Sequence, residues 1–314
     1  MMLMWALVGC GVELDGFVFA GIPCSQVGPD TCDGSDWDGV CLTCEADYAW
    51  DRAYPWFDTM LAEGESVRPI DPSTVTRTLI PTADGEGVLD AYFVPSHGED
   101  PALARTTIFY NHGNFASIEH YVPRIQVLHE LGYNVFVWDY RGYGKSLPAH
   151  SPTPQQFMDD ALLARVHVDG FAPDADKVVI YGYSLGALPA VEASLHRPGC
   201  ALVLEAPFTS LRAIARSGTT VALPESYLSA GLFENPEKIR GYPGPLFAMV
   251  GEDDGRFAPD EVAKIVENAP GPSELWVLPG VEHGISNGGV VEAGMSAYGG
   301  RMREFIEERA SGCF

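Results

Sequence analysis

The sequence predicts an α/β fold, in which helices flank a mostly parallel sheet of about eight strands. Three observations predict it: short apolar runs that lack the alternation of half-exposed strands, helical patterns between those runs, and one hairpin ahead of them. The 314 residues suffice for one large domain of this kind. Hydrophobic residues make up 46% and charged residues 20%, a globular composition that excludes disorder for the chain as a whole.

The strands are predicted from about residue 70 onward. Val75–Pro81 and Val88–Pro95 flank a turn at residues 83–87 that contains two glycines, which is typical of a hairpin. The runs that follow are of strand length and rich in β-branched or aromatic residues, as in central strands buried on both faces. They are Thr106–Tyr110, Asn134–Trp138, Lys177–Tyr181, Ala201–Leu204, Pro245–Val250 and Glu274–Leu278.

Helical patterns separate these strands. The first ends at Gly132, and the second follows Thr153, a candidate N-cap with proline in the first turn. The predicted helices are Tyr121–Leu131, Phe157–Val168, Leu185–Leu195 and Asp260–Asn268. Strand and helix alternate, so the sheet is expected to be mainly parallel, with an antiparallel hairpin at one edge.

The charge balance excludes one class of function. Lys and Arg number 19 and Asp and Glu number 43, so the net charge is −24. Such a chain repels phosphates and has no basic patch, which excludes nucleic-acid binding. It is not drawn electrostatically to anionic lipid either.

The first 65 residues divide into two expected parts ahead of a main domain at 66–314. Residues 7–10 read LVGC and resemble a bacterial lipobox, in which a signal peptide, here residues 1–9, is cleaved before a cysteine that is lipidated. We therefore expect an exported lipoprotein at the cell envelope, held to the membrane only by a lipid on Cys10. No apolar run reaches the length of a transmembrane helix.

Residues 10–65 form a Cys-rich extension, whose aromatic residues are expected to pack it onto the main domain. Six cysteines remain after Cys10, an even number that fits disulfides in an exported protein. Four of them fall in the extension, which leaves the last two to pair with each other. The six are Cys24, Cys32, Cys41, Cys44, Cys200 and Cys313. Two alternatives stay open: a zinc site made by the four cysteines of the extension, and unpaired buried cysteines in a cytosolic enzyme.

A G-x-S-x-G pentapeptide carries the strongest chemical signal. Residues 182–186 read GYSLG, directly after a predicted strand and directly before a predicted helix. This strand–turn–helix context is the one that a nucleophile elbow requires. The glycines let neighbouring backbone approach the serine, and the helix N-terminus favours an oxyanion. We predict Ser184 to be a nucleophile; the alternative is an ordinary turn in a non-catalytic sheet.

A serine nucleophile needs a base, and the base needs an orienting acid. In this architecture both follow the serine along the chain, the acid first. Only His196 and His283 lie C-terminal to Ser184; the first is at the end of the helix behind the elbow, so His283 is predicted to be the base. The acid is expected after the preceding strand, where residues 252–254 offer three consecutive carboxylates.

Two backbone amides are expected to bind the oxyanion. One is the amide of Leu185, directly after the nucleophile. The other comes from the loop after the strand at 106–110, where a His-Gly turn points the amide of Asn114, or alternatively of Phe115, into the site. His112 in that loop is expected to be a structural hydrogen-bonding residue.

These motifs resemble those of the α/β-hydrolase superfamily, in particular the lid-poor branch that includes protein depalmitoylases and monoacylglycerol-lipase-like enzymes. The resemblance covers roughly residues 70–310. It rests on HGN at 112–114, VFVWDYRGYGKS at 135–146, GYSLG at 182–186, EAPFTS at 205–210 and PGVEHG at 279–284. It implies an α/β-hydrolase fold and a serine hydrolase that cleaves carboxylic esters or thioesters through an acyl-enzyme, without cofactor or metal.

The family's G-x-x-D pattern points to Asp254 as the acid. The chain departs from the family in its Cys-rich extension and in residues 255–258 (GRFA), where the family has apolar residues. Residues 207–243 leave room for only a small cap, which favours an open site and a modest acyl ester as substrate. Three alternatives stay open: a serine peptidase or amidase, a non-catalytic surface-binding protein, and a metal-binding module centred on residues 24–44.

Overall fold

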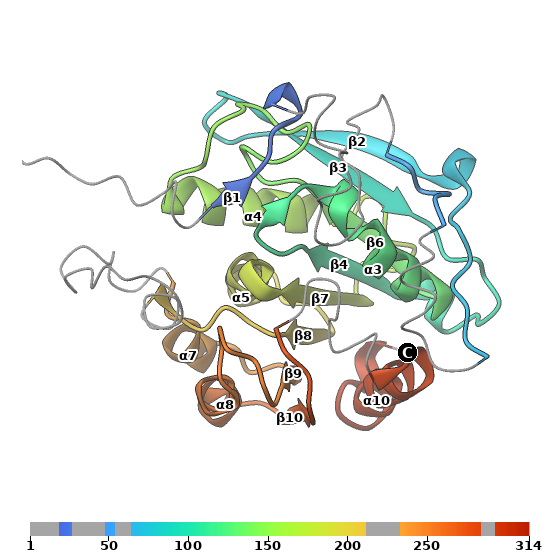
Figure 1. The fold of residues 1–314 in the computed structure, drawn as a ribbon, viewed down its shortest axis with the longest axis vertical. Helices are drawn as coiled ribbons and strands as arrows, with labels where there is room; N and C mark the ends of the chain where they lie inside the picture. The colour runs from blue at the N-terminus through green and yellow to red at the C-terminus, as the bar shows by residue number, and fades with distance from the viewer. Residues whose placement is uncertain (1–18, 27–47, 54–63, 212–232, 284–292, 314) are drawn as a thin grey trace, which may run out of the picture.

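The computed structural model describes residues 19–26, 48–53, 64–211, 233–283 and 293–313. An eight-stranded sheet with the order β10-β9-β8-β7-β4-β6-β3-β2 runs through the centre of the molecule (Figure 1). The strands of this sheet are β2 (Thr76–Pro81), β3 (Val88–Val94), β4 (Thr107–Asn111), β6 (Asn134–Trp138), β7 (Val178–Tyr183), β8 (Ala201–Glu205), β9 (Leu246–Gly251) and β10 (Ser273–Leu278).

Six of the strands are parallel, from β10 across to β6. β3 runs antiparallel to both β6 and β2, so the predicted hairpin lies at one edge of the sheet. Every residue of β4, β6, β7, β8 and β9 is buried. Burial on both faces explains their continuous apolar sequences. The predicted fold class is confirmed.

Helices cover both faces of the sheet. Buried apolar side chains of α3 (Ile118–Glu130) and α10 (Met295–Arg309) belong to one hydrophobic cluster. Those of α4 (Pro154–Val168), α5 (Ala187–His196) and α8 (Pro259–Asn268) belong to the other. The shorter elements are β1 (Ala20–Gly21), η1 (Cys24–Gln26), η3 (Pro72–Thr74), η4 (Leu103–Arg105), β5 (Phe115–Ala116), η5 (Ser184–Gly186), α7 (Asn235–Lys238), η7 (Ile239–Gly241) and η8 (Ser311–Cys313).

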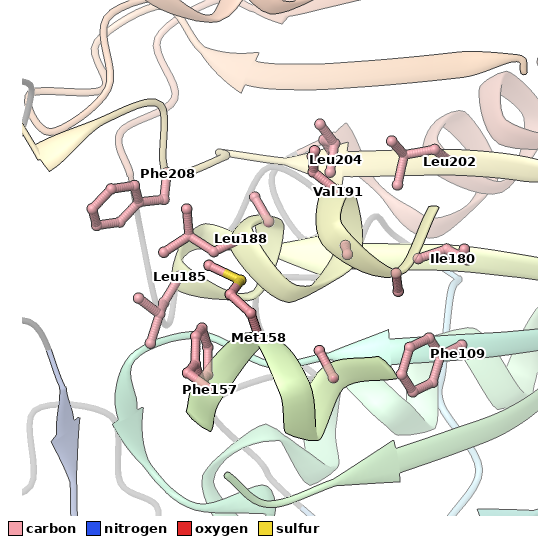
Figure 2. Close-up of a cluster of buried hydrophobic side chains, with 14 of the residues drawn as sticks. Phe109, Phe157, Met158, Ile180, Leu185, Leu188, Val191, Leu202, Leu204 and Phe208 are labelled. Carbon is pink, nitrogen blue, oxygen red and sulfur yellow. The ribbon is translucent and has the colours of Figure 1, made fainter. Parts of the chain in front are cut away.

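Figure 2 shows the core between the sheet and the helices α4 and α5. Phe157 and Met158 of α4, Leu188 of α5, and Ile180 and Leu204 of the sheet belong to this one cluster (Figure 2). Each of these side chains is at most 1% exposed. Because α5 follows the GYSLG turn directly, this packing anchors the helix behind the turn.

Helix α4 begins where the sequence predicted. The Thr153 hydroxyl accepts the amide of Gln156, and the Gln156 side chain accepts the amide of Thr153, which completes a capping box. Pro154 occupies the first helical position, where it has no amide to satisfy.

The C-terminal helix α10 was not predicted. Two adjacent glycines in its middle, Gly299 and Gly300, lower helix propensity and interrupt the apolar pattern. Gly299 lies against Leu131, whose side chain a β-carbon at this position would overlap. Close packing of α10 on the end of α3 therefore accounts for a glycine that local sequence rules count against a helix.

The described parts of the N-terminal extension pack on the main domain. β1 pairs in parallel with β5, and Tyr48 and Trp50 are buried in the same cluster as α3. The predicted signal peptide at 1–9 and the lipidation site Cys10 lie outside the described residues, as do the three cysteines Cys32, Cys41 and Cys44 and most of the predicted cap. Within the described ranges no helix is both long enough and apolar enough to cross a bilayer.

A disulfide joins Cys200 to Cys313, as predicted from the sequence. It ties η8, at the C-terminal end of the chain, to the start of β8. Cys24 is also disulfide-bonded. A cysteine in a disulfide is not a thiolate ligand, so Cys24 does not fit the alternative of a four-cysteine zinc site.

We predict that the double variant Cys200→Ser/Cys313→Ser lowers the free energy of unfolding by about 2–5 kcal/mol, because it releases a loop closed over a sequence separation of 113 residues. Urea unfolding followed by circular dichroism measures this change. The bond lies at the amino end of β8, away from Ser184, so activity per folded molecule should be unchanged. An unfolding midpoint equal to that of the wild type would contradict the prediction.

Candidate active site

The candidate nucleophile stands on the sharp turn between β7 and α5. Ser184 follows β7 directly and begins η5, and its backbone φ is +50°. This left-handed conformation is unfavourable for a residue with a side chain and is found mainly where surrounding structure enforces it. Ser184 is 8% exposed, so its hydroxyl lies in a largely enclosed position.

Both glycines of the GYSLG turn are required by close packing. A β-carbon on Gly182 would lie 2.5 Å from the carbonyl oxygen of Gly186 and 2.7 Å from the Cα of Ala187. A β-carbon on Gly186 would overlap the carbonyl of Asn111 at the end of β4. The backbone of β7 therefore packs directly on the start of the helix, and the helix packs directly on the end of β4. A side chain at Gly182 or Gly186 would prevent this approach.

Three polar side chains meet at this turn. Ser184 Oγ lies 2.9 Å from His283 Nε2, and His283 Nδ1 lies 2.9 Å from Asp254 Oδ2. Ser184 follows β7, Asp254 follows β9, and His283 follows β10. Because these strands are parallel, their carboxyl ends lie at the same edge of the sheet. This explains how residues about 100 positions apart are brought within hydrogen-bond distance.

Asp254 is the one of the three consecutive carboxylates that faces the histidine. Its other oxygen, Oδ1, accepts the amides of Arg256 and Phe257 at 2.8 and 2.9 Å. Glu252 and Asp253 are exposed. The geometry thus selects the residue that the family pattern implied, even though residues 255–258 depart from that pattern.

The loop that carries His283 is fastened to its surroundings. The Tyr183 hydroxyl donates to the His283 carbonyl at 3.3 Å. The imidazole stacks on the Tyr183 ring, with centroids 6.0 Å apart, and meets the Phe257 ring edge-on at 5.4 Å. These contacts restrict the rotation of the imidazole and favour the orientation that points to Ser184.

The buried ion pair of Arg124 and Glu205 packs against the ring of Tyr183. The Arg124 guanidinium of α3 lies 3.8 Å from the centre of the Tyr183 ring and donates to Glu205 Oε1 at 2.7 Å. The other carboxylate oxygen of Glu205 accepts the Tyr181 hydroxyl at 2.5 Å, and the Tyr181 hydroxyl in turn accepts that of Tyr298 at 3.0 Å.

The electrostatics of this network agree with its hydrogen bonds. Burial opposes the charge on Arg124, but the Glu205 carboxylate and nearby tyrosines outweigh burial and hold the Arg124 pKa above its usual value. Burial, and then Glu205, raise the pKa of Tyr181. Sequence reasoning missed Arg124, and it noted Glu205 only as part of a motif. The sequence did contain a signal for this pair: Glu205 is a charged residue at the end of a buried strand, and a buried charge requires a partner.

The loop after β4 reaches the same edge of the sheet. Asn111 is anchored by donating to the Tyr181 carbonyl at 2.9 Å and by accepting the indole N–H of Trp138 at 2.9 Å. Asn114 Oδ1 accepts the hydroxyl of Tyr143 at 2.6 Å. The amide of Phe115 donates to the Tyr121 hydroxyl at 3.1 Å.

His112 has the structural role expected of it. Its ring is fully buried and stacks on Tyr140 with centroids 4.2 Å apart. Its Nδ1 lies 2.8 Å from the Gly113 carbonyl, and its Nε2 lies 3.3 Å from Asp139 Oδ1. The other histidine after the nucleophile, His196, is exposed and pairs with Glu192 on the helix surface. Both imidazoles thus contact groups other than Ser184, whose hydroxyl lies at His283.

No group of three or more His, Cys, Asp or Glu side chains in the described parts of the chain is placed to hold a metal ion. The arrangement that is present has a definite chemistry of its own. An imidazole that touches a serine hydroxyl and is oriented by a buried carboxylate can take the hydroxyl proton as the oxygen attacks an electrophile.

Comparison with known sequences identifies relatives of this chain. Residues 102–242 match the family model described as Serine aminopeptidase, S33 (Hydrolase_4). The chain is 31% identical over 207 residues to an uncharacterized protein of Mycobacterium tuberculosis, which covers 65% of this chain and 71% of that protein. It is 32% identical over 174 residues to the lysophosphatidylserine lipase ABHD12 of Macaca fascicularis, covering 49% of this chain and 42% of the lipase.

A solved structure shares the fold. The esterase Pf2001 of Pyrococcus furiosus superimposes with a TM-score of 0.59 at 23% identity, over 75% of this chain and 93% of the esterase. At that identity the likeness concerns the fold alone. Together with the sheet order, the turn at Ser184 and the sequence matches, it leads to one conclusion: the chain belongs to the α/β-hydrolase superfamily and is a hydrolase.

Proposed function

We propose that this chain is a serine hydrolase that cleaves carboxylic esters or thioesters through an acyl-enzyme. The observation that carries the proposal is the continuous hydrogen-bonded path from Ser184 Oγ through the His283 ring to Asp254. Its two distances of 2.9 Å occur at a largely buried site, where a weakly nucleophilic hydroxyl can be activated.

In the first half of the reaction, Ser184 Oγ attacks the carbonyl carbon of the substrate while His283 Nε2 takes the hydroxyl proton. Asp254 holds the imidazole in orientation and stabilises the imidazolium that forms. The tetrahedral intermediate then collapses. The bond to the leaving alcohol or thiol breaks, His283 returns the proton to it, and the acyl group stays on Ser184.

In the second half, water replaces the alcohol or thiol. His283 takes a proton from water as its oxygen attacks the acyl carbon. When the second intermediate collapses, the bond to Ser184 Oγ breaks, His283 returns the proton to Oγ, and the carboxylic acid is released. Both intermediates carry an oxyanion that needs amide donors.

The amides of Leu185 and Asn114 are the donors that we assign to this oxyanion. Leu185 lies in the first turn of η5, where amides have no acceptor within the helix. In the loop after β4, Asn114 directly follows the His-Gly turn, and its side chain accepts the Tyr143 hydroxyl at 2.6 Å.

A second candidate function uses the same residues on amide bonds. The family model that matches residues 102–242 is described as a serine aminopeptidase, which favours this alternative, whereas the similarity to a lipase favours esters. A non-catalytic binding role is less favoured, because a protein that only binds has no need for the strained turn and the complete set of three side chains.

Location also belongs to the proposal. Disulfides persist in oxidising compartments, and the bonds at Cys24 and between Cys200 and Cys313 support export of the chain. Together with the lipobox-like residues 7–10, they favour a lipoprotein of the bacterial envelope anchored through Cys10.

The variant Ser184→Ala tests the nucleophile. We expect it to abolish labelling by a fluorophosphonate probe and to lower kcat for p-nitrophenyl butyrate by about 10⁴–10⁶-fold, because the Ser184 hydroxyl is the group that lies against His283 Nε2. Ser194→Ala is the matched control, since Ser194 is also buried but donates to Val191 within α5. A folded Ser184→Ala variant that is still labelled at the wild-type rate would reject the assignment.

The preference for the leaving group is tested with butyryl substrates in which the acyl group is bound to oxygen, sulfur or nitrogen. We expect turnover of p-nitrophenyl butyrate and of the butyryl thioester, and turnover of butyryl p-nitroanilide no faster than the Ser184→Ala background. An amino-terminal substrate, alanine p-nitroanilide, covers the aminopeptidase alternative. Anilide turnover that disappears in Ser184→Ala would decide for that alternative.

The lipid anchor is tested in a bacterial host that is fed an alkyne fatty acid. Wild-type chain should incorporate the label and sediment with membranes, whereas Cys10→Ala should do neither, because the acceptor thiol is gone. Equal labelling of the two proteins would reject Cys10 as the lipidation site.

A further inference from the structure

The N-terminal extension touches the catalytic edge of the sheet through a short segment, Phe19–Cys24. β1 within it pairs with β5 in the loop that carries Asn114. Further along, the Gly144 amide donates to the Ile22 carbonyl at 3.0 Å, and the Cys24 amide donates to the Gly144 carbonyl at 2.7 Å. The segment therefore joins two loops of the hydrolase domain that are about 30 residues apart in sequence.

Between these two backbone contacts the segment lies on Tyr143. A β-carbon on Gly21 would lie 2.5 Å from Tyr143 Cδ2 and 2.6 Å from the Gly142 carbonyl oxygen. Only glycine allows the backbone to approach the ring so closely. Tyr143 is fully buried, and its hydroxyl donates to Asn114 Oδ1 at 2.6 Å.

Both ends of the segment are anchored. Phe19 is 3% exposed and packs against Phe157 of α4 at 4.9 Å between ring centroids. Cys24 at the other end is disulfide-bonded. A backbone held at two ends and pressed on a buried ring leaves that ring little freedom, so the hydroxyl of Tyr143 stays where it meets Asn114.

We propose that the segment Phe19–Cys24 positions the oxyanion hole, with Gly21 and Tyr143 as positioning residues for the Asn114 amide. The inference rests on the proposed function, in which that amide stabilises the oxyanion. The family model matches residues 102–242. The segment Phe19–Cys24 therefore lies outside the matched region, whereas Tyr143 and Asn114 lie within it. Loops are otherwise the more mobile parts of a fold, and an oxyanion donor acts only when it is held at the right distance.

The variant Tyr143→Phe tests the proposal because it removes one hydroxyl and keeps the ring. Loss of a complete oxyanion donor costs about 10²–10³ in kcat; a displaced donor should cost less, and we expect about a tenfold fall in kcat. KM should stay within about twofold, since the donor acts mainly on the transition state. Tyr242→Phe is the matched control: Tyr242 is equally buried, but its hydroxyl donates to Pro245 at the amino end of β9.

Gly21→Ala tests the segment itself, because its methyl group must push the backbone away from Tyr143. If both residues act through Asn114, the double variant Gly21→Ala/Tyr143→Phe should lose little more than the stronger single variant. A product of the two single losses would show independent effects and would overturn the proposal. Tyr143→Phe keeps the proposal falsifiable if Gly21→Ala does not fold.

Different results would reject the proposed function and the positioning role of Phe19–Cys24. Folded wild-type protein that neither hydrolyses butyryl esters nor reacts with the fluorophosphonate would reject the proposed function and this inference with it. An active wild type, together with a Tyr143→Phe variant whose kcat equals that of Tyr242→Phe, would reject the inference alone.

Discussion

The backbone at Ser184 is held in a conformation that the residue would not adopt by itself, and the rest of the site is arranged around it. A side chain at positive φ costs of order 1–2 kcal/mol. The packing of α5 on the sheet and the absence of side chains at Gly182 and Gly186 make the turn possible. The Ser184 carbonyl also accepts the amide of Phe208 at 2.9 Å, which links the turn to the segment after β8.

A second strained residue lies beside the first. Ala206, directly after β8, has φ of +43°, and its amide donates to the carbonyl of Met249 in β9. Glu205 just before it holds Arg124 beneath Tyr183. Neighbouring strands thus leave the sheet through unfavourable conformations at the edge where the three polar side chains meet, and the core below these strands supplies the stability that permits the strain.

The supports of the site reach it from three directions. α3 supplies Arg124, the loop after β9 supplies the amides that hold Asp254, and the N-terminal extension approaches the loop of Asn114 through Tyr143. Arg124 and the loop after β9 hold Tyr183 and Asp254, which in turn contact His283. The extension acts on the loop of the proposed oxyanion donor. The supports therefore fix the groups that surround the reacting atoms, which is the usual relation between a rigid scaffold and the loops that carry chemistry.

Local sequence determined much of this protein. Apolar runs that lack alternation predict the buried parallel strands, and the capping box predicts the start of α4. The strand–turn–helix context of GYSLG predicts the turn at Ser184, since each of these signals acts over a few residues. The order of residues along the chain also predicts His283 as the base, because only two histidines follow Ser184 in the sequence.

Only the tertiary structure decided which groups meet. Glu252, Asp253 and Asp254 are equivalent in local sequence, and the direction of each side chain depends on the loop after β9. The pair of Arg124 and Glu205, 81 positions apart, forms because α3 packs under the end of β8. Gly299 of helix α10 is explained by its close packing on Leu131. Gly21 is explained by its close packing on Tyr143. Such contacts depend on the arrangement of distant segments, which no local pattern encodes.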